Sequence, residues 1–308
     1  MNRRVAVIDI GTNSILYLLV EKNGDGRLDC AFQQMESTRL GENLDATGKI
    51  APRLLAKAVS VIARYRDLAR SQKAEKLAVV GTHLFRTAAN RESVVQTLFH
   101  ETGMEVRVLS ENEEAEWSHR GAVYGRAFAG PVISADIGGG STEIVLGLAD
   151  QIAESASAPL GAVSLTERFL SHDPPTPDEL TALEICIASS VENRFGSILA
   201  KGKRLVVTGG TPTTLAALDL GLTRYDPERV DGHDLSEVSI TRFLKALAGV
   251  NLAERRKRLA LDPKRADIIL GGTAILRAIL KTGPFRKAMV SDRGLRFGIA
   301  LKEFNPSS

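Results

Sequence analysis

The sequence has few cysteines, no long apolar run and no charge excess of either sign, and each absence excludes a class of protein. Cys30 and Cys186 are too few for a disulfide framework and lack the spacing of a metal site, so we expect a reducing, cytoplasmic setting. No apolar run approaches the roughly 20 residues that cross a bilayer, and the first apolar strand starts too early to leave room for a signal peptide. The 40 basic and 37 acidic residues balance too closely to argue for nucleic acid. We therefore expect neither a membrane nor a nucleic acid as partner.

The length and the order of elements predict an α/β protein of two domains. The chain has 308 residues, which is more than one hydrophobic core usually serves. Three predicted strands are followed by alternating helices and strands, and the second half repeats this order. The glycine-containing stretch 125–130 is the natural boundary. We expect one domain at 1–125 and a second at 126–294.

One motif occurs twice, each time between two apolar, β-rich runs. Its copies are Asp9-Ile10-Gly11-Thr12-Asn13-Ser14 and Asp136-Ile137-Gly138-Gly139-Gly140-Ser141. A strand, a tight glycine turn and a second strand form a hairpin, and a glycine turn lets backbone N–H groups converge on an anion. A third glycine turn, Thr208-Gly209-Gly210-Thr211, follows another strand. Plain hairpin geometry is the alternative, but three such turns with hydroxyl residues favour phosphate binding. The candidate phosphate-binding residues in the turns are Thr12, Asn13, Ser14, Gly138, Gly139, Gly140, Ser141, Gly209, Gly210 and Thr211.

Three carboxylates at the ends of the hairpin strands are candidate metal ligands: Asp9, Asp136 and Glu143. Asp136 and Glu143 flank one turn, so both side chains can point the same way. Mg²⁺ takes one or two carboxylates and completes its shell with water and phosphate oxygens. The alternative is that each Asp caps its own turn. Recurrence of the Asp in both halves favours the metal.

Two adjacent acidic residues, Glu113 and Glu114, lie at the start of a predicted helix. Ser110 and Glu113 have the spacing of a capping box, and neighbouring helical side chains point about 100° apart. Glu114 is thus left to act as a general base on water, although spacing alone favours a solvated carboxylate. Arg86 can offer a bidentate fork to phosphate.

These motifs together resemble those of the exopolyphosphatase and guanosine pentaphosphate phosphohydrolase family. The similar segments are Asp-Ile-Gly-x-Asn-Ser at 9–14, Gly-Thr-His-x-x-Arg at 81–86, Glu-Glu-Ala at 113–115, Asp-Ile-Gly-Gly-Gly-Ser-Thr-Glu at 136–143, Pro-Leu-Gly-Ala-Val at 159–163, Leu-Thr-Glu-Arg-Phe at 165–169, Gly-Gly-Thr-x-Thr-Thr at 209–214, Arg-Ala-Asp at 265–267 and Ser-x-x-Gly-Leu-Arg at 291–296. They span almost the whole chain in the family's order.

The resemblance implies a fold and a set of roles. It implies two ribonuclease-H-like domains, each with a mixed sheet and with the active-site cleft between them, as in the superfamily of actin, sugar kinases and heat-shock chaperone ATPases. The topology of that superfamily also implies that the C-terminal helix within 295–308 completes the domain at 1–125. It also implies that Glu114 is catalytic, that Asp136 and Glu143 organise Mg²⁺, and that Arg86 contacts phosphate. The sequence departs from the family at Leu16 and Ser164, where basic or imidazole side chains are frequent.

We therefore predict an exopolyphosphatase that uses Mg²⁺ and removes terminal phosphate from inorganic polyphosphate. The first alternative is the same reaction on guanosine pentaphosphate. A small-molecule kinase of the same superfamily and a non-catalytic sensor of polyphosphate or alarmone are further alternatives. Preferred chain length stays open, and so does a homodimer.

Overall fold

The computed structural model describes residues 3–148 and 151–305, so residues 1–2 and 306–308 of the expected first domain lie outside the described part. The chain divides into two compact units. The first is Met1–Trp117 with Leu295–Ser308, and the second is Ser118–Gly294. The division falls within helix α5 (Glu111–Val123), ahead of the glycines at 125–130.

The first unit is built on a mixed sheet, in the order β3-β2-β1-β4-β5 among the described residues. β1, β2 and β3 form an antiparallel meander, and β4 and β5 add to β1 in parallel. The strands are β1 (Arg3–Ile10), β2 (Ser14–Lys22), β3 (Leu28–Ser37), β4 (Lys76–Gly81) and β5 (Arg107–Val108). This strand order is that of the ribonuclease-H-like sheet that the family resemblance implies.

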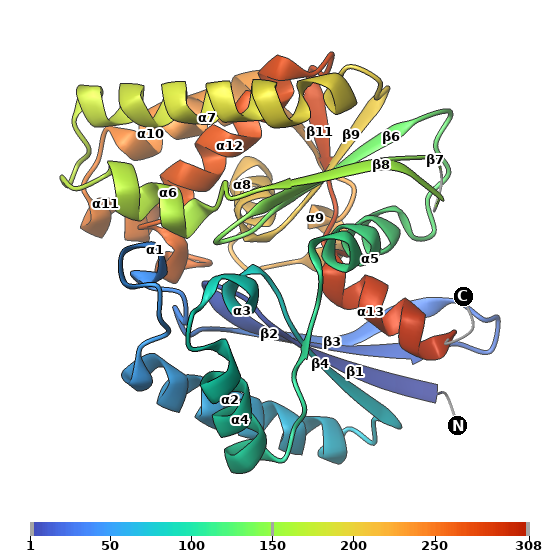
Figure 1. The fold of residues 1–308 in the computed structure, drawn as a ribbon. Coiled ribbons are helices and arrows are strands. Elements are labelled where there is room, and N and C mark those ends of the chain that lie inside the picture. The colour runs from blue at the N-terminus through green and yellow to red at the C-terminus, as the bar shows by residue number, and fades with distance from the viewer. Residues whose placement is uncertain (1–2, 149–150, 306–308) are drawn as a thin grey trace. The chain divides into compact units, whose positions relative to one another are not determined.

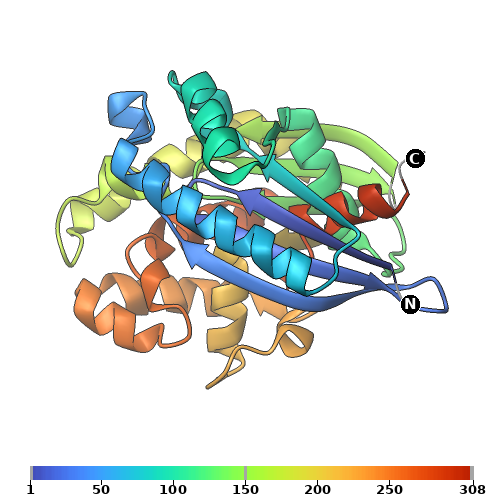
Figure 2. The same cartoon turned by 90° about the horizontal axis from the view of Figure 1, so that it is seen from below.

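Helices cover both faces of this sheet. Successive side chains of β1 point to opposite faces of the sheet, and Ala6, Ile8 and Ile10 on one face belong to a core shared with α2 (Pro52–Ser71). Figure 2 shows α2 lying along the strands of this unit. α13 (Leu295–Phe304) packs on β1, β2 and β4, and Figure 1 shows it on the face opposite to α2. The other helices assigned to this unit are α1 (Leu44–Thr47), α3 (His83–Thr87) and α4 (Arg91–Thr102).

The second unit repeats the plan and extends it. Its sheet has the order β10-β11-β9-β6-β7-β8. Taken from the other edge, β8, β7, β6, β9 and β11 correspond in order to β3, β2, β1, β4 and β5 of the first unit, and β10 is an additional strand. The strands are β6 (Val132–Ile137), β7 (Thr142–Leu148), β8 (Gln151–Ala158), β9 (Arg204–Thr208), β10 (Asp234–Ser236) and β11 (Lys287–Val290). Two mixed sheets of one design confirm the predicted fold class.

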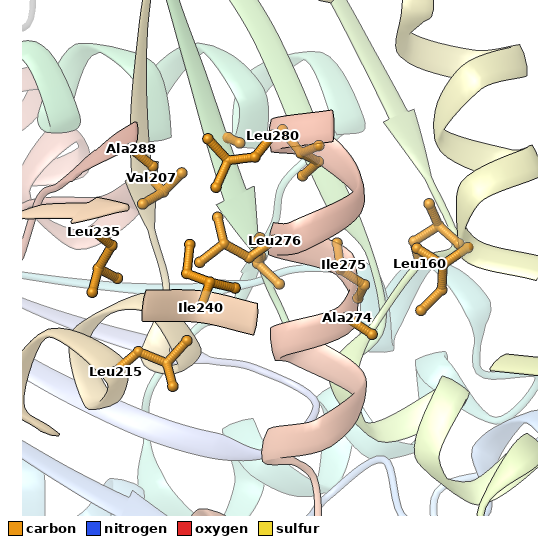
Figure 3. Close-up of a cluster of buried hydrophobic side chains, with 14 of the residues drawn as sticks. Leu160, Val207, Leu215, Leu235, Ile240, Ala274, Ile275, Leu276, Leu280 and Ala288 are labelled. Atoms are coloured by element: carbon orange, nitrogen blue, oxygen red, sulfur yellow. The ribbon is translucent and has the colours of Figure 1, made fainter. Parts of the chain in front are cut away.

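The core of the second unit lies between this sheet and its long helices. Figure 3 shows Ile275, Leu276 and Leu280 of α12 beside Leu160 and Val207. The described helices are α6 (Ala162–Phe169), α7 (Pro177–Leu199), α8 (Gly210–Asp219), α9 (Pro227–Val230), α10 (Glu237–Ala248), α11 (Leu252–Arg258), the short 3₁₀ helix η1 (Pro263–Arg265) and α12 (Ile269–Thr282). Among all described residues, no helix is long and apolar enough to span a membrane.

Two local features differ from what the sequence suggests. The polar stretch 223–235, which reads as a loop, contains α9 and the start of β10, because β10 gains its ladder only by pairing antiparallel to β11. The basic run at 255–258 reads as a solvated helix face, but Arg255 is buried. Its guanidinium donates hydrogen bonds to the carbonyl oxygens of Leu247, Val250 and Ala266, which makes it a structural residue.

Candidate active site

The two glycine turns have the same backbone geometry. In the first unit, the N–H of Gly11 donates to the carbonyl oxygen of Ser14 at 3.0 Å. In the second, the N–H of Gly138 donates to the carbonyl oxygen of Ser141 at 2.9 Å. A Cβ at Gly138 would lie 3.0 Å from that oxygen, so the tight closure favours glycine at this position. The duplication read from the sequence is therefore a duplication of structure.

The turn of the second unit is fixed by the start of α6. The N–H groups of Ala162 and Val163 donate to the carbonyl oxygens of Gly138 and Gly139 at 3.0 and 2.8 Å. A Cβ at Gly161 would lie 2.1 Å from the carbonyl oxygen of Gly139, so the helix approaches the turn through a glycine. These contacts leave the turn little freedom, which suits a preorganised anion site.

The third glycine turn connects a strand to a helix. Gly209 has φ 104° and is the N-cap of α8, so the first N–H groups of this ten-residue helix end at the turn. The guanidinium of Arg265 lies against it, since a Cβ at Gly210 would be 2.1 Å from Arg265 Nη1. The Thr211 hydroxyl faces α12, where a Cβ at Gly272 would lie 2.1 Å from it. If this turn binds an anion, Thr211 would contribute its backbone N–H rather than its hydroxyl.

Asp136 and Glu143 stand directly opposite each other on β6 and β7. On its other side, Asp136 pairs with Thr208 of β9. Cross-strand partners point to the same face of a sheet, so the two carboxylates and the hydroxyl project together. Glu143 and Thr208 are each 2% exposed, and Thr208 Oγ1 has no hydrogen-bond partner among the described residues. These hard oxygen donors fit a divalent cation such as Mg²⁺.

The third candidate ligand, Asp9, has different neighbours. It pairs with Leu16 on β2 and with Val80 on β4, so both of its cross-strand partners are apolar. Within residues 3–148 and 151–305, no group of three or more His, Cys, Asp or Glu side chains gathers closely enough to hold a metal ion. A cation at Asp136 and Glu143 would thus depend on water or substrate oxygens for the rest of its shell.

The start of α5 carries the predicted capping box. Ser110 Oγ accepts from the N–H of Glu113 at 3.2 Å, and Glu113 Oε2 accepts from the N–H of Ser110 at 3.0 Å. This backbone hydrogen bond, with help from Arg107, lowers the pKa of Glu113. The capping role predicted for Glu113 is confirmed.

Glu114 is directed to another partner. Its side chain is 10% exposed, and its Oε2 accepts a hydrogen bond of 2.6 Å from Nη1 of Arg86. The same nitrogen donates to the carbonyl oxygen of Leu109 at 2.9 Å. The sequence placed both residues at the site but did not show that they pair.

The Arg86 guanidinium is only partly satisfied by these bonds. Its Nε and Nη2 are buried and have no hydrogen-bond partner among the described residues. Unpaired buried donors are costly, so such a pair of N–H groups suits an anion such as a phosphate oxygen. Burial and the nearby Arg86 charge lower the pKa of His83, which keeps its imidazole neutral at pH 7.

Sequence reasoning missed several polar residues that lie beside the candidate site. Ser118 follows Glu114 by one turn of α5, a spacing that could have been read from the sequence, and its hydroxyl bonds to Asp136. Ser157 bonds to Glu143, but only the strand register reveals it. Arg265 belongs to a noted motif, and its contact with Gly210 needed the structure.

The two units share a mixed sheet and a glycine turn. Together with the paired carboxylates and the two unpartnered N–H donors of Arg86 among the described residues, these features indicate a protein that binds phosphate groups. Comparison with known proteins makes this specific. A family model described as the Ppx/GppA phosphatase family matches residues 19–305. The chain therefore belongs to the Ppx/GppA phosphatase family.

Similar proteins cover nearly the whole chain. Exopolyphosphatase 2 of Mycobacterium tuberculosis is 35% identical over 317 aligned positions, which cover 97% of this chain and 98% of the relative. The crystal structure of the Aquifex aeolicus member of the Ppx/GppA family matches with a TM-score of 0.84 and 30% identity, covering 100% of this chain and 99% of that one. The crystal structure of an exopolyphosphatase from Cytophaga hutchinsonii, at 22% identity, shares the fold with a TM-score of 0.90 and covers 99% of each chain.

Proposed function

We propose that this protein hydrolyses the terminal phosphoanhydride bond of inorganic polyphosphate. The observation that carries the proposal is the Arg86 guanidinium, which pairs with Glu114 and keeps two buried N–H donors without a partner among the described residues. A guanidinium that binds a carboxylate with one nitrogen, and whose other N–H donors have no partner, is suited to hold a phosphate group beside that carboxylate. Membership of a phosphatase family and the exopolyphosphatases among the relatives support the substrate.

Each group has a role in the proposed reaction. Arg86 and the N–H groups of the glycine turns bind oxygens of the terminal phosphate. Glu114 takes a proton from the attacking water as its oxygen bonds to phosphorus. The bond from phosphorus to the bridging oxygen breaks, and the products are orthophosphate and a chain one unit shorter. Phosphoryl transfer requires mainly positioning and charge neutralisation, which these groups supply.

Mg²⁺ is the proposed cofactor, and Asp136 and Glu143 are the residues that would hold it, with Asp9 as a further candidate. When bound, the cation would neutralise negative charge on the phosphoryl oxygens. The paired register of the two carboxylates and the adjacent Thr208 hydroxyl support this assignment.

Guanosine pentaphosphate is the second candidate substrate. Leu16 is half-buried opposite Asp9, and Ser164 lies in α6 with its hydroxyl donating to the carbonyl oxygen of Gly161 at 3.3 Å. Neither supplies the basic group that is frequent at these positions in the family. We therefore rank polyphosphate first.

Release of orthophosphate from polyphosphate, guanosine pentaphosphate and ATP, each with and without Mg²⁺, tests the proposal. We expect the highest kcat/KM on polyphosphate and no release when Mg²⁺ is chelated. A higher kcat/KM on guanosine pentaphosphate would reverse the ranking. Binding of polyphosphate without release under any of these conditions would indicate a sensor, and transfer of phosphate from ATP to a small acceptor would indicate a kinase.

A further inference from the structure

We propose that two serine hydroxyls, Ser118 and Ser157, position the carboxylates of Asp136 and Glu143 to bind a divalent cation. The inference rests on the proposed function, because it concerns the cation of that reaction. All four residues belong to the second unit, and they come from α5, β6, β7 and β8.

The first contact is short and buried. Ser118 is 3% exposed, and its Oγ donates to Asp136 Oδ2 at 2.5 Å. α5 is held on this face of the sheet by the next residue, since His119 Nδ1 lies 2.8 Å from Ser134 Oγ. The absence of a side chain at Gly147 makes room for His119, because a Cβ there would lie 2.3 Å from its Nε2.

The second contact follows from strand register. β8 pairs antiparallel to β7, and Ser157 is the direct cross-strand partner of Glu143. Its Oγ donates to Glu143 Oε1 at 2.9 Å. Glu143 therefore has Asp136 opposite it on one neighbouring strand and Ser157 opposite it on the other.

A hydroxyl on one oxygen restricts how a carboxylate rotates. The terminal torsion of Asp and Glu is broad, so a carboxylate without such a partner samples many orientations. A cation that is bound by only two carboxylates depends on both being correctly oriented before it arrives. Hydrogen-bonding partners of metal ligands typically account for about 10- to 100-fold in metal affinity. Ser118 and Ser157 are thus positioning residues that act through Asp136 and Glu143.

Direct cation binding tests the inference without turnover. Isothermal titration of the full-length protein with Mg²⁺, in the absence of substrate, gives the Kd of the wild type and of Ser118→Ala and Ser157→Ala. We expect each variant to raise the Kd by about 10- to 100-fold. Ser118→Thr keeps a hydroxyl and should restore most of the affinity. The Mg²⁺ concentration for half-maximal polyphosphate hydrolysis should rise in parallel, while kcat at saturating Mg²⁺ changes much less.

Ser155→Ala is the matched control. Ser155 is exposed and lies two residues before Ser157 on the same strand and face, so its loss should leave the Kd unchanged. Wild-type affinity in both Ala variants, or a lower melting temperature of the metal-free protein with no change in Kd, would overturn the inference. Failure of the proposed cation site looks different, because the wild type would then bind Mg²⁺ no better than a protein with both Asp136→Asn and Glu143→Gln.

Discussion

The β1–β2 hairpin of the first unit and the β6–β7 hairpin of the second have similar turns but different side chains beside them. In each hairpin the first strand enters the turn through Asp-Ile-Gly, and a hydrogen bond from the glycine N–H to the serine carbonyl oxygen closes the turn. Opposite the aspartate, however, the first hairpin places Leu16 and the second places Glu143.

The neighbouring parallel strand differs in the same sense. β4 places Val80 beside Asp9, whereas β9 places Thr208 beside Asp136. At the two cross-strand positions, one copy of the repeat thus places apolar residues beside its aspartate, and the other places oxygen donors there. Both copies share the closing hydrogen bond of the turn, and under the proposed function the two cross-strand positions would decide which copy can also hold a cation. We infer that both units offer glycine-turn N–H groups to phosphate, that the second unit alone adds the paired carboxylates for the cation, and that the first adds Arg86 and the base Glu114.

The largest expected effect comes from the oxygen-rich hairpin. Asp136→Asn or Glu143→Gln removes a charge but keeps the shape of the side chain, so the fold should survive while hydrolysis of polyphosphate falls to the background of the assay. Loss of charge stabilisation by a cation is expected to cost several kcal/mol. Phosphate release measures the loss of hydrolysis, and circular dichroism checks that the fold survives. Near-normal turnover at near-normal Mg²⁺ would refute the cation assignment.

Glu114→Gln is expected to have the next largest effect. It should lower kcat by about 10² to 10⁴, which is the usual contribution of a general base. Polyphosphate affinity should hold or improve, because a negative charge beside a polyanion is removed. Steady-state kinetics give both values.

The control for this variant is Glu113→Gln, because Gln also serves in a capping box. It should leave kcat near that of the wild type. An inactive Glu113→Gln beside an active Glu114→Gln would mean that the base is wrongly assigned.

A smaller effect is expected in the apolar hairpin. Asp9→Asn should reduce kcat/KM by about tenfold, which corresponds to about 1.4 kcal/mol. This is less than for Asp136→Asn, because Asp9 has no carboxylate opposite it. The comparison needs both variants assayed over the same range of Mg²⁺. An equal loss of kcat/KM in both variants would show that the two aspartates contribute alike to hydrolysis. The residues opposite them on the neighbouring strands would then not determine which aspartate binds the cation.

The sequence predicted those features that local pattern controls. The repeated Asp-Ile-Gly turns and the last helix at 295–304 follow from glycine, apolar runs and helical spacing, whereas the mixed sheets were expected from the family resemblance. β10 was missed because Asp234–Ser236 is too short and polar to show a pattern, and its pairing with β11 is non-local. Arg255 was misjudged because its acceptors are backbone oxygens that no sequence motif marks.

The same distinction applies to the candidate site. Its residue types could be predicted from the sequence, because glycine turns and carboxylates recur at fixed positions. The contacts between its residues could not be predicted, since Arg86 and Glu114 are 28 residues apart and meet only in the folded unit. Ser157 contacts Glu143 because the register of β7 and β8 places them opposite each other. A register shift of one residue would turn the Ser157 side chain to the other face of the sheet.

The smallest expected effect concerns stability rather than turnover. It tests the structural role of Glu113, in contrast to the catalytic role proposed for Glu114. Glu113 has a folded-state pKa below its ordinary value of 4.5, first because of the Ser110 N–H and then because of Arg107. An acid whose pKa is depressed by folding contributes stability in full above its unfolded pKa, and this contribution is lost as the pH falls through its folded pKa. Glu113→Gln keeps the cap but not the charge. The variant should therefore unfold at a lower urea concentration than the wild type at pH 7, and the two midpoints should converge well below pH 4.5.

The second unit provides a reference for this measurement. Its own capping box, Thr176 and Glu179 at the start of α7, also lowers a glutamate pKa, through hydrogen bonds first from Ser171 and then from His172 and the Thr176 N–H. Glu179→Gln should show the same convergence at acid pH, but over a range that extends lower, because more donors hold that carboxylate ionised. A gap between wild type and Glu113→Gln that persists unchanged into acid would mean that the Glu113 charge does not stabilise the helix, and that Glu113 acts at α5 only through the shape of its hydrogen bond.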